Sequence, residues 1–227
     1  MAYQQVTLST LQTYLSDRYE GTPFWAAEEA RLALNEALQV WNALTGFWKS
    51  TGTAVTTIDS QWVTVPGALT FTTRVLTSAR TLGKSSIYEM DMGIANWEAQ
   101  KTNTGGNVPN YIKLWAPVGI TRIAIWPIDH VGGTTLTFDG VAVTPVLTSS
   151  GDYIDIGQEE LDVLLGYALH VLAFKRGGEA FQLTKPKYDA FMAAAVTRNG
   201  MLASSERFKQ FKGLDFTREA DPMKKEA

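Results

Sequence analysis

The sequence contains no cysteine and only two histidines among its 227 residues. The absence of cysteine excludes disulfide scaffolds, thiol nucleophiles and cysteine-ligated zinc. With His130 and His170 as the only imidazoles, there is little from which to build a histidine metal cluster or a histidine-based acid–base site. The sequence therefore argues against several common kinds of catalytic centre before any motif is considered.

Charge is also scarce, since 19% of the residues are charged and the net charge is −3. This balance excludes the strongly basic profile of a nucleic-acid coat protein. The polar N-terminus lacks the pattern of a signal peptide, and no run of eighteen apolar residues occurs. We therefore expect a soluble protein, made in the cytoplasm, that does not associate with a membrane.

What the sequence does contain is 45% hydrophobic residues, enough for a substantial core, distributed over regions of different character. The pattern predicts an α+β fold in which N- and C-terminal helices form a bundle and a β-rich insertion lies between them. We place the N-terminal helices in residues 1–50, the insertion in 51–157, the C-terminal helices in 158–203 and a charged, aromatic tail in 204–227.

The N-terminal region predicts two helices. Leucines recur at helical spacing from Leu8 to Leu15. A second helix is expected to begin at Thr22-Pro23, with threonine as the N-cap and proline in the first helical position. Its apolar stripe runs from Ala30 to Leu44, and Gly46 is expected to end it.

The middle region predicts strands because β-branched residues alternate with polar ones. The clearest predicted strands are Gln61–Pro66, Ile120–Pro127 and Tyr153–Ile156. The run Thr135–Val143 predicts a hairpin with its turn at Asp139-Gly140. Weaker strand patterns occupy Thr73–Leu82, Ile87–Met90 and Asn110–Trp115, and a short helix is expected over Asp91–Gln100.

The C-terminal region predicts two further helices. The first begins at Gln158 and ends at Gly177-Gly178, and the second runs from Glu179 or Pro186 to about Met201. A single amphipathic helix cannot bury its own apolar stripe, so the outer helices of the chain are expected to pack together.

The search for chemical motifs finds none that calls for a cofactor, a metal or a catalytic group. The Gly105-Gly106 loop has no lysine–serine pair after it and does not open a helix, which favours a flexible loop over a phosphate site. Asp129-His130 favours a surface turn over a catalytic dyad, and His170 favours a core or interface imidazole. An acidic cluster favours the complementing of a helix dipole over cation binding. Its members are Asp152, Asp155, Glu159, Glu160 and Asp162.

Seven tryptophans are expected mostly in the core, with one or two at a subunit interface. The tail combines aromatic and charged residues, which is typical of an arm that becomes ordered on a partner. The candidate partner-binding residues are Phe208, Lys209, Phe211, Lys212, Leu214, Phe216 and Arg218. The alternative is that these rings pack back on the chain's own helices.

Several short motifs follow one another along most of residues 8–200. They are Trp25, Asn35-Glu36-Ala37, Trp62-Val63-Thr64-Val65-Pro66, Pro109-Asn110-Tyr111, Ile123–Pro127 and Tyr167-Ala168. In their type and order they resemble the motifs of the head-to-tail adaptor proteins of tailed bacteriophages, also called connector or tail tubular A-type proteins.

The resemblance implies a structural virion protein and not an enzyme. Such a protein forms a ring, a dodecamer in that family, between the portal and the nozzle or tubular protein of the tail. Double-stranded DNA passes through the ring without sequence-specific binding. The protein would be made in the host cytoplasm and located in the neck of the virion, and its tail would bind the portal or a neighbouring subunit.

Two other functions remain compatible with the residues alone. A β-rich module that binds carbohydrate or peptide would expose tryptophans on its sheet. A small hydrolase would place Asp129-His130 or the acidic cluster in a pocket of substrate size.

Overall fold

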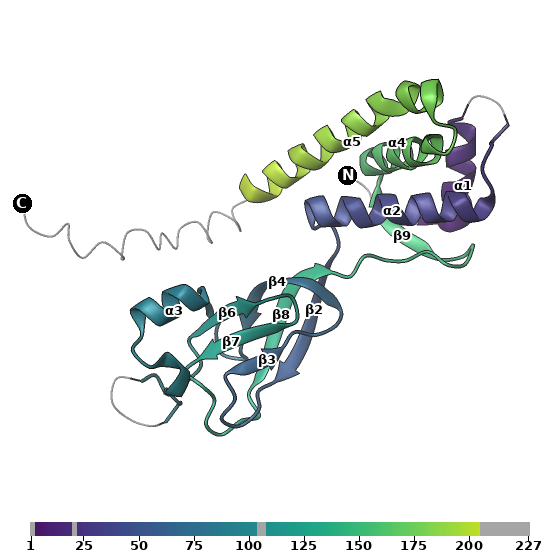
Figure 1. Cartoon of the computed structure of the whole chain (residues 1–227). Helices are drawn as coiled ribbons and strands as arrows, with labels where there is room; N and C mark the ends of the chain where they lie inside the picture. The colour runs from purple at the N-terminus through teal and green to yellow at the C-terminus, as the bar shows by residue number, and fades with distance from the viewer. Residues whose placement is uncertain (1–2, 20–21, 104–107, 205–227) are drawn as a thin grey trace, which may run out of the picture. The chain divides into compact units, whose positions relative to one another are not determined.

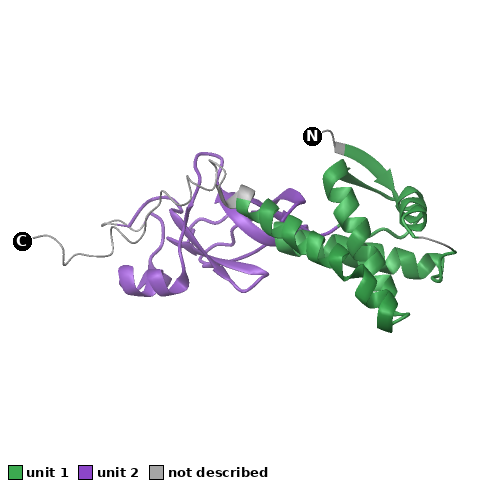
Figure 2. Ribbon diagram, turned by 90° about the horizontal axis from the view of Figure 1, so that it is seen from above, with its two compact units in different colours: residues 1–45, 145–227 green, residues 46–144 purple. Residues whose placement is uncertain are grey.

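The computed structural model describes residues 3–19, 22–103 and 108–204, and it confirms the α+β class. The chain divides into two compact units, coloured separately in Figure 2. Residues 1–45 and 145–227 make up the first, here called the helical unit, and residues 46–144 make up the second, here called the β unit. The chain therefore leaves the helical unit once and returns to it once.

Four helices from the two ends of the chain form the helical unit (Figure 1). They are α1 (Leu8–Asp17), α2 (Ala27–Thr45), α4 (Gln158–Phe174) and α5 (Gly178–Ser204). Helix α4 packs against each of the other three, and α2 also packs against α5. Even the polar residues Glu160 and His170 are buried along α4, together with its leucines and alanines. Helix α4 therefore lies inside the unit rather than on its surface.

Helix α2 begins later than its sequence pattern predicts. Thr22-Pro23 precedes the helix without capping it, and the next two residues, Phe24 and Trp25, pack edge-to-face on each other and on Tyr19. The Glu29 carboxylate accepts a hydrogen bond from the Ala26 N–H at 2.8 Å, which satisfies one donor at the start of the helix.

The other ends of these helices follow the sequence more closely. Gly46 has a φ of 56°, a conformation that favours glycine, directly after α2 ends. Helix α4 begins at Gln158 as predicted. Helix α5 begins at Gly178 and contains Pro186 in its interior, so this proline does not mark a helix start.

A two-stranded antiparallel ribbon completes the helical unit. It pairs β1 (Tyr3–Thr7) with β9 (Tyr153–Gly157), two segments from opposite ends of the chain. Three apolar side chains of the ribbon are buried, namely those of Val6, Ile154 and Ile156. The sequence pattern predicts β9 but not β1, and it places β9 in the β-rich insertion, whereas the structure places it in the helical unit.

The β unit contains two sheets, one with strand order β2-β8-β4 and one with order β3-β7-β6-β5. The first sheet consists of β2 (Lys49–Val55), β4 (Leu69–Leu76) and β8 (Thr135–Ala142). The second consists of β3 (Trp62–Thr64), β5 (Gly83–Lys84), β6 (Leu114–Val118) and β7 (Arg122–Trp126). Apolar residues of both sheets share one core, including Trp115, Ile125 and Phe138.

The predicted hairpin at Asp139-Gly140 is wrong, because β8 runs through these residues without a turn. A Cβ atom at Gly140 would collide with the carbonyl oxygen of Phe71 in β4, so glycine permits a close approach of strands here. The Asp139 carboxylate pairs with Arg74 and accepts a hydrogen bond from the Thr51 hydroxyl at 2.8 Å. The Asp-Gly pair thus links three strands.

Two further segments differ from their sequence patterns. Ile87–Met90 is the start of helix α3 (Ile87–Gly93) and not a strand, because Ser86 and Glu89 form a capping box. A 3₁₀ turn follows at Trp97–Ala99, inside the expected short helix. Strand β2 is missed because its inward positions, which are only half-buried, hold serine, glycine and alanine rather than large apolar residues.

We predict that Leu38→Asp unfolds the helical unit. Leu38 is 2% exposed in α2, so the substitution places an unpaired carboxylate in the core at a cost of about 4 kcal/mol or more. Gln39→Asp, at the exposed neighbouring position, is the matched control. Thermal and urea unfolding followed by circular dichroism measure both, and equal stability of the two variants would contradict the prediction.

Candidate functional site

The side chains of Asp129 and His130 bind different partners. Asp129 is buried and accepts hydrogen bonds from the Thr56 hydroxyl at 2.5 Å and from the N–H groups of Val131 and Gly132 at 3.2 and 3.0 Å. Burial alone would raise the pKa of Asp129, but these hydrogen bonds together lower it. His130 Nδ1 lies 2.8 Å from Asp59 instead. Asp129 therefore shapes the turn at the end of a strand.

The acidic cluster at the start of α4 is divided among separate structural roles. Asp162 pairs with Arg18, and Glu160 is buried and lies 3.1 Å from Arg198. The Glu160 carboxylate folds back over Gly157, where a Cβ atom would collide with it. Within residues 3–19, 22–103 and 108–204, no three histidine, aspartate or glutamate side chains are arranged to hold a metal ion.

His170 is a core residue, as its position in the sequence predicts. Its Nδ1 atom lies 2.9 Å from the Thr184 hydroxyl, and its ring stacks on Phe181 with centroids 4.3 Å apart. Burial lowers the pKa of His170, which favours the neutral imidazole. The ring thus joins α4 to α5.

Four of the seven tryptophans are buried, and two are half-buried, in agreement with the expectation that most lie in the core. The buried ones are Trp41, Trp97, Trp115 and Trp126. Trp62 in β3 is 41% exposed. Trp62 is thus the exposed indole of the β unit among the described residues.

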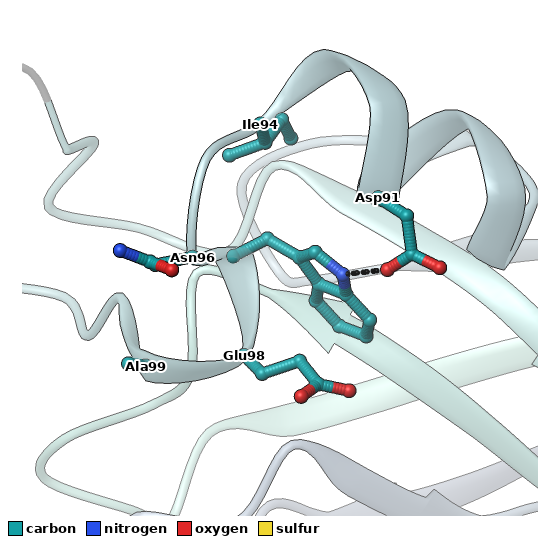
Figure 3. A pocket seen from close by; sticks show the side chains of 6 residues that line it. Asp91, Ile94, Asn96, Glu98 and Ala99 are labelled. Carbon is teal, nitrogen blue, oxygen red and sulfur yellow. Dashed lines mark hydrogen bonds between the residues drawn. The ribbon is translucent and has the colours of Figure 1, made fainter.

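A shallow hollow of about 390 Å³ lies beside α3 (Figure 3). Its wall includes Trp97, whose indole N–H donates to Asp91 at 2.5 Å. Asp91 and Glu98 are the acidic residues of the lining, and one of them already holds the indole. The Asp91 carboxylate thus serves to hold the Trp97 ring in place.

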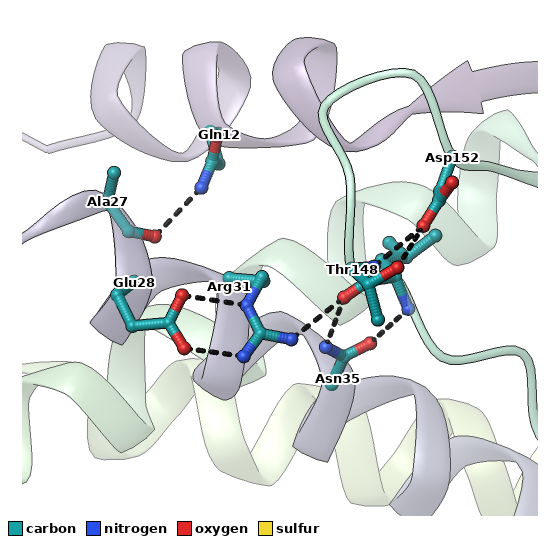
Figure 4. A network of polar contacts seen from close by, with 8 residues as sticks. Gln12, Ala27, Glu28, Arg31, Asn35, Thr148 and Asp152 are labelled. Carbon is teal, nitrogen blue, oxygen red and sulfur yellow. Dashed lines mark hydrogen bonds and ion pairs between the residues drawn. The ribbon is translucent and has the colours of Figure 1, made fainter.

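The most developed polar site instead lies where the chain returns to the helical unit (Figure 4). The Asn35 amide is buried in α2 and binds both backbone groups of Leu147: its Nδ2 donates to the carbonyl at 2.8 Å, and its Oδ1 accepts from the N–H at 2.8 Å. Leu147 itself is 1% exposed. We call this arrangement the re-entry clamp.

Charged groups extend the re-entry clamp on both sides. Arg31 donates to the same Leu147 carbonyl at 3.0 Å. It also donates to the Glu28 carboxylate in an ion pair, and the hydrogen bond between Arg31 and Glu28 lowers the pKa of Glu28. Asp152 accepts hydrogen bonds from the backbone of Ser149 and Thr148, which lower the pKa of Asp152. The loop after Leu147 is thus fixed by its own carboxylate and by α2.

The Asp152 loop also fixes the first helix. The Leu8 N–H donates to the Asp152 carbonyl at 2.8 Å, and the Ser9 N–H donates to the Ser150 carbonyl at 3.2 Å. The loop therefore supplies acceptors to donors at the start of α1 that have no partner inside the helix. Sequence reasoning missed this role for Asp152.

In the sequence, Asn35 stands out only as part of the short motif Asn35-Glu36-Ala37. A stronger signal was available, since asparagine stands among buried alanines and leucines on the stripe of α2 and a buried amide requires hydrogen-bond partners. Its partner, 112 residues away, was not predictable by pattern.

The candidate partner-binding residues of the tail fall in residues 204–227. Phe208, Lys209, Phe211, Lys212, Leu214, Phe216 and Arg218 lie outside the described residues. No helix of the described part is long and apolar enough to cross a membrane.

Comparison with known proteins gives one family. Residues 6–208 match a family model described as the SU10 adaptor protein, so the match includes both units. No curated protein matches the chain.

We predict that Asn35→Leu destabilises the protein by about 2–3 kcal/mol, because it leaves the buried Leu147 N–H without a partner. Gln39→Leu, at an exposed position of the same helix, is expected to change the free energy of unfolding by less than about 0.5 kcal/mol. Urea titration measures both, and faster hydrogen exchange at Leu147 in the first variant locates the effect. An unchanged stability for Asn35→Leu would show that the clamp contributes nothing.

Proposed function

The chain belongs to the SU10 adaptor protein family of phage head-to-tail adaptors, and on that premise we propose that it forms a ring joining the portal to the tail. The family match over residues 6–208 carries this proposal. The family is a structural one and not an enzyme family. The uses of Asp129, His170 and the acidic cluster in holding the fold agree with such a role.

The proposed architecture assigns different tasks to different parts of the chain. The helices of residues 1–50 and 158–203 act as one bundle that carries the β-rich insertion. The packing of α4 against both N-terminal helices supports this arrangement. The segment 204–227 is proposed as an arm that reaches a partner.

The proposed ring stands in the neck of the virion, with the portal on one side and the nozzle or tubular protein of the tail on the other. By its resemblance to the adaptors it contains twelve copies. Double-stranded DNA passes through the ring during ejection. The net charge of −3 suits such a conduit, because a strongly basic lumen would hold passing phosphates.

The arm is proposed to bind the portal or a neighbouring subunit through aromatic anchors. Phe208, Phe211 and Phe216 lie among lysines and arginines, and aromatic rings flanked by charge are typical of interface hot spots.

We predict that deletion from Ser205 onward leaves a folded monomer that no longer binds the portal ring. Co-sedimentation with purified portal and circular dichroism of the free chain provide the two measurements. Substitution of Phe208, Phe211 and Phe216 by serine is expected to weaken binding as the deletion does. Serine at Glu206, Gln210 and Thr217, in the same segment, is the matched control. Unchanged portal affinity after deletion would contradict the arm, and loss of folding would favour packing of the tail on the chain's own helices.

We also predict that a variant carrying His130→Ala and His170→Leu assembles normally. The variant is expected to lose about 1–2 kcal/mol of stability from the contacts of His170 with α5. Electron microscopy of particles and plaque titres measure assembly and infectivity. Normal particles with no infectivity would indicate a chemical role for one of the two imidazoles.

A further inference from the structure

One end of the helical unit carries exposed apolar and cationic side chains beside half-buried aromatic rings. At the turn from α4 to α5, Phe174 is 73% exposed, and Leu183 in α5 is 71% exposed. Solvent-exposed apolar side chains of this size are typical of a contact surface when they occur together with other interface residues.

The same end contains an ordered aromatic group. The rings of Tyr19 and Trp25 lie 5.0 Å apart, and those of Phe24 and Trp25 lie 4.9 Å apart. The Arg176 guanidinium lies 5.2 Å from the centre of the Phe24 ring and donates to the Tyr19 hydroxyl at 2.5 Å. We call Tyr19, Phe24, Trp25, Phe174 and Arg176 the aromatic end.

The composition of the aromatic end matches that of interface hot spots, which are enriched in tryptophan, tyrosine and arginine. Arg176 is held in place by two aromatic side chains, so little side-chain freedom remains to be lost on docking. Within the described chain, Arg176 has no carboxylate within ion-pair distance. A carboxylate on a docked partner is therefore the complement that it lacks.

A matching surface lies at the start of α4. On the outer side of the ribbon, Tyr153 is 54% exposed, and Asp155 stands opposite Gln5 in the register and is exposed with it. Glu159 is exposed in the first turn of α4. Among the described residues, neither Asp155 nor Glu159 has a cationic partner. We call Tyr153, Asp155 and Glu159 the acidic ribbon face.

Phe174 and Asp155 lie too far apart to meet within one chain. Helix α4 runs from Gln158, beside the acidic ribbon face, to Phe174 in the aromatic end. A helix of 17 residues is about 25 Å long, and its packing against three other helices keeps it straight and in place. The exposed Tyr153 and Asp155 thus lie before the first turn of α4, whereas the exposed Phe174 and Arg176 lie at and just after its last turn.

From this arrangement we infer that the aromatic end of one copy docks on the acidic ribbon face of the next copy. The occupant of each surface is a second copy of this chain, joined head to tail. Two different faces at opposite ends of a rigid unit produce a heterologous contact, which closes into a ring when the rotation between copies allows it. The inference rests on the proposed ring and states which surfaces build it.

The absence of cysteine makes a direct cross-linking test possible, because every disulfide in a variant is an introduced one. Phe174→Cys and Asp155→Cys are combined in one chain, which is assembled on purified portal rings and then oxidised. We expect a ladder of covalent oligomers on a non-reducing gel. Each single variant alone is expected to remain monomeric, and an equimolar mixture of the two is expected to stop at dimers.

The matched control combines Phe174→Cys with Lys113→Cys, an exposed position in the β unit. Cross-linking of the control as efficient as that of the Phe174→Cys and Asp155→Cys chain, or none in either, overturns the inference. Failure of the unsubstituted chain to assemble on portal overturns the proposed function, and the inference falls with it. Assembly without the specific cross-link overturns the inference alone.

Charge exchange supplies an independent measurement. Arg176→Glu and Asp155→Arg are each expected to raise the concentration needed for half-maximal assembly by about tenfold or more, and their combination is expected to recover most of that loss. Arg122→Glu, on an exposed strand position of the β unit, is expected to change it by less than about twofold. Additive losses in the combined variant would contradict a contact between Arg176 and Asp155.

Discussion

The structure depends above all on the burial of α4, a helix whose apolar residues face neighbours on almost every side. Such a helix is stable only when other elements surround it, and the chain supplies α1 and α2 from its beginning and α5 from its end. After the β unit, the chain must therefore return to a fixed position in the helical unit, so that α4 and α5 can pack on α1 and α2. Asn35 fixes that place by binding both backbone groups of Leu147. Strand β9, which pairs with β1, then leads directly into the start of α4.

Much of this arrangement could be predicted where a pattern is local and apolar. The stripe of α2 and the start of α4 predict their helices correctly because burial on one face imposes the periodicity directly. The apolar run Ile123–Trp126 predicts a strand correctly, and the structure buries both of its faces. The predicted hairpin is wrong because the same pair of residues can serve two different structural purposes. Asp139-Gly140 is typical of a hairpin turn, yet here the glycine admits a neighbouring backbone and the aspartate binds Arg74. Nothing local distinguishes the two uses.

The candidate sites show the same limit for polar residues. Asp129-His130 and the acidic cluster contain groups that occur in active sites, but their partners decide their role. Those partners are Thr56, Asp59 and Arg198, each far away in the sequence. Asn35, by contrast, belongs to no chemical motif and is central to the fold. For a structural protein, the informative polar residues are the buried ones with backbone partners.

The two crossings between the units have a mechanical consequence. The chain leaves the helical unit at the end of α2, near Thr45, and it returns just before Leu147, which is bound to the middle of the same helix. A force on the β unit therefore reaches α2 at two points, separated along the helix by about 15 Å. The first is a covalent junction and the second is a set of hydrogen bonds. A pull on the β unit is therefore carried by α2 both through the covalent junction near Thr45 and through the hydrogen bonds of Asn35 with Leu147.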